Sequence, residues 1–143
     1  MKIIYLLLLI QLEIISSSIN IEFSTYYIIF MKDNGFNLEL YDVVGDDEYI
    51  LSLLYLKPKS TVWRVAYFQH GLSDTVWCYF QLGLKILPFL LAKNGFDVWL
   101  GNSRRNIFSL KHKTKAPTDK KSGFFDFSMD DNVQYDLTAT IKY

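Results

Sequence analysis

Runs of apolar and polar positions along residues 36–100 predict strands on either side of a helix. Leu38 and Leu40 lead through residues 42–44 into a turn at "GDDE", and residues 49–56 ("YILSLLYL") form a second β-prone run. Two such runs around a Gly/Asp turn predict a hairpin. Residues 57–60 ("KPKS") predict a loop, because Pro58 breaks the strand. The nearly continuous apolar run at residues 61–69 predicts a third strand, buried on both faces of a sheet.

Two helices are predicted from their end signals. Pro88 occupies a first helical position and Gly95 the position after a helix end, with "FLLAKN" between them. A fourth strand follows at residues 96–100 and ends at "GNS". Ser128, three residues before Asp131, is a capping pattern for a second helix. On that helix Val133, Leu137 and Ile141 recur at helical spacing and form an apolar stripe. The order hairpin, strand, helix, strand, helix predicts an α/β fold.

The N-terminus has the pattern of a secretory signal. Lys2 precedes an apolar stretch at residues 3–10, and three serines at residues 16–18 offer a cleavage site. We therefore expect a signal peptide at residues 1–19 and a folded part from residue 20 to 143. A signal anchor or a buried N-terminal element is the alternative.

Composition narrows the class of protein. Half of the 143 residues are apolar and the formal net charge is zero, so a sizeable core is available and no global field favours nucleic acid. The single cysteine, Cys78, cannot form an intramolecular disulfide, and a buried apolar thiol is expected. Residues 104–121 are strongly basic. A solvated loop is the favoured interpretation, and binding of RNA or an anionic membrane is the alternative.

Several segments together resemble one family. "YDVV", "QHGL", "NGFDVWLGNSR" and "FFDFSMDD…YDLTATI" occur in the order and spacing of the acid lipases, the lysosomal and gastric lipase relatives within the α/β-hydrolase superfamily. The resemblance covers residues 33–143 and implies an α/β-hydrolase fold with a Ser-Asp-His triad. It implies hydrolysis of neutral lipid esters, triacylglycerols or steryl esters, by a secreted or lysosomal protein. No metal, organic cofactor or nucleic acid is implied; the partners are the lipid ester and, transiently, a membrane or lipid-droplet surface.

The resemblance also assigns residues. In this mechanism backbone N–H groups stabilise the developing oxyanion, one of them from the loop after the third strand. By resemblance that donor is the backbone N–H of Leu72, while Gly71 and His70 shape the loop. Asn102 and Arg104 in "GNSR" are expected to brace a neighbouring loop by hydrogen bonds.

The sequence departs from the family pattern in two places and in extent. Arg105 stands where the family has glycine, which strains the loop by about 1 kcal/mol if that position needs a positive φ. Thr138 replaces a proline, which a helix tolerates. Ser73 and Ser103 do not lie in G-x-S-x-G, and no downstream acid or histidine completes a triad. We therefore expect the N-terminal part of a lipase sequence, inactive alone. The alternative is a short secreted protein that binds lipid or a partner without catalysis.

Overall fold

The computed structural model describes residues 25, 28–58, 64–81 and 83–143, which fall into two compact units, residues 1–35 and 36–143. In the first unit residues 28–33 are helical, and the Asn34 side chain donates to the Phe30 carbonyl at 2.8 Å. The expected signal peptide, residues 1–19, lies outside the described residues. No helix in the described part is long and apolar enough to cross a membrane.

The second unit begins with the predicted hairpin. β1 (Asn37–Val44) pairs antiparallel with β2 (Tyr49–Lys57), and Val44 lies opposite Ile50 next to the turn. The Gly45 N–H donates to the Tyr49 carbonyl at 2.9 Å, and Glu48 has a φ of 71°. The turn at residues 45–48 therefore closes the hairpin where the Gly/Asp signal placed it.

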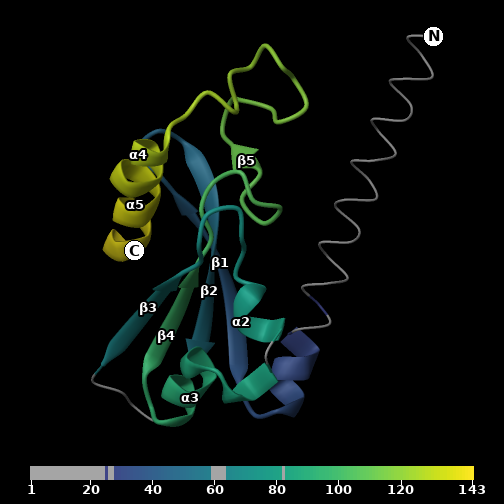
Figure 1. Ribbon diagram of the computed structural model, residues 1–143, viewed down its shortest axis with the longest axis vertical. Coiled ribbons are helices and arrows are strands. Elements are labelled where there is room, and N and C mark those ends of the chain that lie inside the picture. The colour runs from purple at the N-terminus through teal and green to yellow at the C-terminus, as the bar shows by residue number, and fades with distance from the viewer. Residues whose placement is uncertain (1–24, 26–27, 59–63, 82) are drawn as a thin grey trace, which may run out of the picture. The chain divides into compact units, whose positions relative to one another are not determined.

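The predicted strand, helix, strand unit is confirmed. β3 (Val65–Gln69) pairs parallel with β4 (Asp97–Gly101), and α3 (Leu87–Lys93) lies between them in sequence. The strands are ordered β1-β2-β4-β3, and β5 (Lys111–His112) pairs with the start of β2 (Figure 1). The sheet is mixed, because β2 is antiparallel to β4. The fold is thus α/β with a partial, open sheet.

The ends of α3 follow their sequence signals. Pro88 lies in the first helical turn after Ile86, where its missing N–H leaves no bond unmade. At the other end, the Gly95 N–H bonds to Ala92 and the Phe96 N–H to Leu91. This is a Schellman motif, which needs a left-handed residue, and Gly95 has a φ of 87°. The short helices α2 (Cys78–Gln81) and η1 (Gly83–Lys85) precede α3.

The expectation that the third strand is buried on both faces is wrong. Residues 61–63 lie outside the described residues, and Val65, the first residue of β3, is 70% exposed. β3 pairs only with β4 and lies at the edge of the described sheet. An edge strand has a neighbour on one side only, so apolar character did not ensure burial.

Helices cover both faces of the sheet. On one face Val98 and Leu100 are fully buried, and α3 supplies the equally buried Phe89. On the other face the Tyr55 ring stacks on Trp99, and Tyr143 from the C-terminal helix lies edge-on to Trp99. This places the C-terminal helix against the face opposite to α3.

The C-terminal helix starts as predicted but has an unexpected middle. Ser128 caps α4 (Met129–Asp131) in a reciprocal capping box with Asp131. The chain then runs through a π-helical segment, η2 (Asn132–Leu137), into α5 (Thr138–Lys142). The predicted apolar stripe does not face the core, since Val133 is 62% and Ile141 is 67% exposed. The buried positions are instead polar, Asp136 and Thr140.

Candidate functional site

The loop after β3 is tied to the loop after β4 through His70. The backbone N–H of Ser103 donates to His70 Nε2 at 3.2 Å, and His70 Nδ1 lies 2.8 Å from the Gly71 carbonyl. Because Nε2 accepts, Nδ1 carries the proton and donates to that carbonyl. His70 therefore joins the ends of two adjacent parallel strands.

The Leu72 amide follows directly after His70 and Gly71, in the same loop. The Leu72 side chain is 75% exposed, and its N–H bonds to no described residue. The left-handed conformation of this turn falls on Ser73, with a φ of 63°. A Cβ on Gly71 would meet nothing within 4 Å, and its φ is not positive. The turn itself therefore does not require glycine at position 71.

Two asparagines continue the connection from His70 into the sheet. The Asn106 amide lies 3.1 Å from His70 Nε2 and donates to Asn102 Oδ1 at 2.9 Å. Asn102 is 1% exposed; it accepts from the Val76 N–H and donates to the Ser52 carbonyl at 3.1 Å. Asn102 thereby links three segments of chain: β2, the loop after β3 and the loop after β4.

A second polar chain reaches Ser103 from the C-terminal helix. Thr140 Oγ1 donates to Tyr67 Oη at 3.2 Å, Tyr67 donates to Gln69 Oε1, and Gln69 Nε2 donates to Ser103 Oγ at 2.9 Å. This chain passes directly over Gly101, where a Cβ would lie 2.7 Å from Gln69 Oε1. Position 101 is therefore restricted to glycine by close approach.

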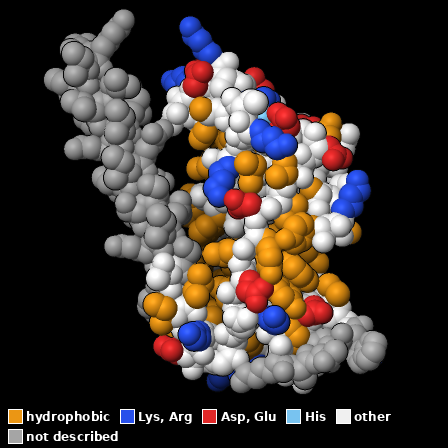
Figure 2. Space-filling view, turned by 180° about the vertical axis from the view of Figure 1, so that it is seen from behind, with side chains coloured by type: hydrophobic (Ala, Val, Ile, Leu, Met, Phe, Trp, Pro, Cys, Tyr) orange, Lys and Arg blue, Asp and Glu red, His pale blue; other side chains and the backbone are white. Residues whose placement is uncertain are grey.

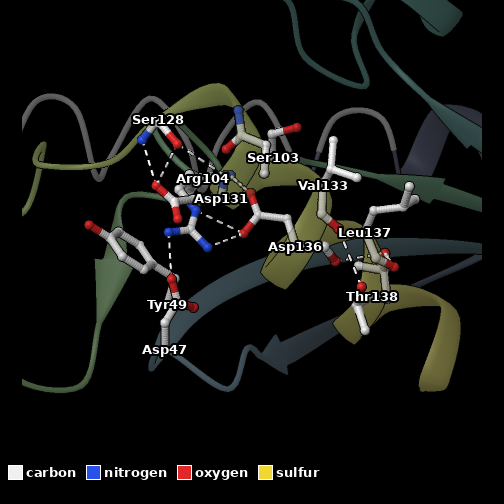
Figure 3. A network of polar contacts seen from close by, with 12 residues as sticks. Asp47, Tyr49, Ser103, Arg104, Ser128, Asp131, Val133, Asp136, Leu137 and Thr138 are labelled. Atoms are coloured by element: carbon white, nitrogen blue, oxygen red, sulfur yellow. Dashed lines mark hydrogen bonds and ion pairs between the residues drawn. The ribbon is translucent and has the colours of Figure 1, made fainter.

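Arg104 connects the C-terminal helix to the hairpin turn. Its backbone N–H and Nε each donate to Asp136 at 2.9 Å, and Nη2 does so at 2.7 Å (Figure 3). Nη1 donates to Asp47 at 2.6 Å, and the guanidinium lies 4.0 Å from the centre of the Tyr49 ring. In Figure 3 Asp136 points toward Arg104, whereas Val133 and Leu137 point away from it. Arg104 thus holds the helix in the orientation that exposes the apolar stripe.

Burial sets the electrostatics of this cluster. Burial by itself lowers the pKa of Arg104, but the hydrogen bonds that it donates to Asp136 and Asp47 raise it above its ordinary value. Burial raises the pKa of Asp136, and the hydrogen bonds from Arg104 oppose that rise. Burial likewise raises the pKa of the Tyr67 hydroxyl. All three groups take part in hydrogen bonds that join the C-terminal helix to the sheet.

The structure brings most of the candidate residues together. His70 contacts the backbone after β4, and the Asn102 amide bonds to the loop that contains Gly71 and Leu72. Arg104 instead forms ion pairs with Asp47 and Asp136. The Ser103 hydroxyl accepts a hydrogen bond from the Gln69 amide. Among the described side chains there is no cluster of three potential metal ligands.

Sequence reasoning missed four participants: Tyr67, Gln69, Asn106 and Asp136. Asp136 lies inside the quoted segment "YDLTATI", so its motif was noticed but its role was not. Asn106 follows Asn102 by four residues, with no regular element to make the spacing meaningful. Tyr67 and Gln69 lie two residues apart in β3 and therefore on the same face of the strand. This spacing could have predicted that their polar groups are neighbours.

Known proteins similar to this chain are lipases. No family model matches the chain. It is 42% identical over 117 residues to human lipase member K, covering 76% of the chain and 29% of that protein. It is 39% identical over 117 residues to human lipase member N, with 77% and 29% covered. It is 41% identical over 117 residues to mouse gastric triacylglycerol lipase, with 76% and 29% covered. The chain thus spans less than a third of the length of these relatives.

Proposed function

The chain belongs to the acid lipase family of α/β-hydrolases, as a segment that spans less than a third of its relatives' length, and on this premise we propose that it contributes to hydrolysis of neutral lipid esters. Triacylglycerols and steryl esters are the substrate classes. The single observation that carries the proposal is the loop at residues 70–72. It follows β3, its Leu72 N–H is bound by no described residue, and His70 fixes it to the end of β4.

The proposed role of these residues is to stabilise an oxyanion. Ester hydrolysis passes through a tetrahedral intermediate whose negative oxygen needs preorganised N–H donors. The Leu72 amide is proposed as one such donor. His70 fixes its loop and Asn102 supports that loop, whereas Arg104 braces the neighbouring loop after β4. Gly71 serves by leaving room for substrate, since a Cβ there meets no protein atom within 4 Å.

We do not assign the nucleophile to any serine of these 143 residues. Ser103 Oγ accepts from Gln69, and neither Ser73 nor Ser103 lies in G-x-S-x-G. We propose that the 143-residue chain by itself does not cleave esters. Short-chain ester hydrolysis by the purified chain would contradict this.

A chimera tests the catalytic proposal. Residues 33–143 replace the matching segment of mouse gastric triacylglycerol lipase, and triacylglycerol hydrolysis is measured. The chimera should be active, and Leu72→Ala should retain activity because the donor is backbone. Gly71→Val should lower kcat by about a hundredfold or more, because its side chain would fill the space left for substrate and keep the oxyanion away from the Leu72 donor. Full activity of Gly71→Val in a folded chimera would refute the loop assignment.

The proposed route is the secretory pathway, with residues 1–19 as a cleaved signal and residues 20–143 as the lipase part. The apolar stretch at residues 3–10 and the serines at residues 16–18 support this. N-terminal sequencing of material secreted from a eukaryotic host should give a new N-terminus near residue 20. An intact Met1 would refute cleavage.

A further inference from the structure

The basic segment after β5, residues 113–125, is a loop whose backbone is held by hydrogen bonds; we name it the basic loop. Its start is capped by His112, whose Nδ1 accepts from the backbone N–H groups of Thr114 and Lys115 at 3.1 Å each. Its far side is closed by Ser122, whose hydroxyl lies 2.7 Å from the carbonyls of both Ala116 and Asp119. The loop therefore presents its side chains from a fixed backbone.

Most of the cations of this region have no acidic partner. Residues 104–121 contain seven Lys and Arg residues and one Asp, in a chain of zero formal net charge. Arg104 and Lys111 are used in ion pairs with aspartates. Among the described residues no ion pair is formed by the other cations, which are Arg105, Lys113, Lys115, Lys120 and Lys121. The carboxylate of Asp119 accepts from the backbone N–H of Lys121.

An aromatic pair anchors this loop and extends from it. Phe124 is buried against the Tyr49 ring, and the Tyr49 hydroxyl donates to the Phe124 carbonyl. The next residue, Phe125, lies edge-on to Phe124 and is 52% exposed. The loop therefore combines fixed cations with one exposed ring.

The basic loop lies at the same end of the sheet as the Leu72 amide. β3 and β4 are parallel and end side by side at Gln69 and Gly101. Gly101 pairs with Leu53 of β2, which runs the other way from its start at Tyr49. β5 pairs with that start, so the loops after β3 and after β5 leave the sheet at one end. Figure 2 shows lysine and arginine side chains at this end, with acidic side chains among them.

We propose that the basic loop, with Lys113, Lys120, Lys121 and Phe125, docks the protein on an anionic lipid surface. Lysines near such a surface are attracted to it, and a half-exposed aromatic ring gains by entering the boundary between headgroups and acyl chains. Docking through this end directs the loop at residues 70–72 toward the lipid. The inference rests on the proposed function, because a lipase must meet its substrate at such a surface.

A lipid surface fits the loop better than a single-stranded nucleic acid does. Proteins that bind single strands combine a basic groove with several rings on which successive bases stack. Phe125 is the one aromatic ring of the basic loop that is more than half exposed. A single exposed ring among separated cations is better suited to a lipid surface, where binding does not require successive rings spaced to match successive bases.

Vesicle binding tests the proposal. The purified chain is titrated with phosphatidylcholine vesicles with and without phosphatidylserine, at low and high salt, and tryptophan fluorescence or co-sedimentation reports binding. A triple variant, Lys113→Gln, Lys120→Gln and Lys121→Gln, removes three exposed cations without breaking an ion pair. The control changes Lys85, Lys93 and Lys142 to Gln, which removes the same charge elsewhere and likewise breaks no ion pair among the described residues. Circular dichroism confirms that both variants fold.

The proposal expects salt-sensitive binding to the phosphatidylserine vesicles. The loop variant should bind on the order of 100-fold more weakly, since each lysine near the surface contributes roughly fivefold. Phe125→Ala should weaken binding by about tenfold, and the control should bind like the parent. Equal binding of the loop and control variants would overturn the proposal. So would equal binding to vesicles without phosphatidylserine, or displacement of the chain from vesicles by a small amount of RNA.

This experiment measures no hydrolysis, so it separates the two proposals. An inactive but folded chimera, together with intact vesicle binding by the chain, would refute the proposed function and leave the docking surface standing. Normal activity without vesicle binding would refute the docking surface alone.

Discussion

Asp136 accepts three hydrogen bonds from Arg104, two from the guanidinium and one from the backbone N–H. Both side chains are almost fully buried, with 1% and 5% of their surfaces exposed. The pair therefore fixes the C-terminal helix to the end of β4 through both side-chain and main-chain contacts.

Breaking this pair should strongly destabilise the chain. Asp136→Asn leaves the buried Arg104 guanidinium without its main counter-charge, and such a loss costs about 3–5 kcal/mol. Urea unfolding followed by circular dichroism measures the change. The control is Lys111→Met, which removes the exposed pair with Asp42 and should cost at most about 1 kcal/mol. Similar losses for the two variants would show that Asp136 is not a structural centre.

Arg105→Gly should stabilise the loop after β4. The expectation of strain at this position is supported, because Arg105 has a φ of 79°, where a side chain is unfavourable. Glycine adopts this conformation freely, and we expect a gain of about 1 kcal/mol in the free energy of unfolding. Arg105→Ala keeps the Cβ and should give no such gain. An alanine variant as stable as the glycine variant would refute the strain.

Substitution by alanine should change the stability of the chain much more at Gly101 than at Gly71. A Cβ on Gly101 collides with the Tyr67 and Gln69 side chains, so Gly101→Ala should cost about 1–3 kcal/mol. A Cβ on Gly71 meets nothing, so Gly71→Ala should change stability by about 0.5 kcal/mol or less, or raise it slightly. Thermal melts of both variants make the comparison. A large loss at Gly71 would mean that the loop packs differently.

The cap of the C-terminal helix should respond to acid. Hydrogen bonds from the backbone and side chain of Ser128 lower the pKa of Asp131. A carboxylate with a lowered pKa in the folded state stabilises the fold above its unfolded pKa, about 4. That stabilisation is lost as the pH falls through the lower, folded value. Unfolding measured between about pH 5 and pH 2 should therefore show less pH dependence in Asp131→Asn than in the parent.

Cys78 should react slowly while the chain is folded. Burial raises the pKa of its thiol, and the charge of Asp74 raises it further, so little thiolate exists at neutral pH. Iodoacetamide labelling followed by mass spectrometry should be much slower in buffer than in urea. Equal rates in the two conditions would refute a protected thiol.

The parts of the fold that were predicted correctly are those marked by local sequence signals. Pro88 and Gly95 mark the ends of α3 because a missing N–H and a left-handed residue act within one turn of chain. Ser128 marks the start of the C-terminal helix for a similar reason. Burial was harder to predict, because it depends on neighbours that are distant in sequence. Val65 is apolar yet exposed, since β3 has a strand on one side only.

The candidate site divides in the same way. Family resemblance pointed to His70, Asn102 and Arg104, but their partners lie far along the chain: His70 bonds to Ser103 and Arg104 to Asp136. No spacing rule connects residues separated by more than thirty positions. The side-chain partners of these residues therefore had to come from the three-dimensional arrangement.

The π-helical segment η2 sets the phase of the helix that follows it. An α-helix turns by about 100° per residue, so deleting one residue within residues 132–135 would rotate everything after it relative to the cap by that angle. Asp136 would move away from Arg104, and Thr140 would move away from Tyr67. The wide turn therefore acts as a one-residue insertion that selects which side of the helix meets the sheet. Its loss would present the wrong side without changing a single contacting residue.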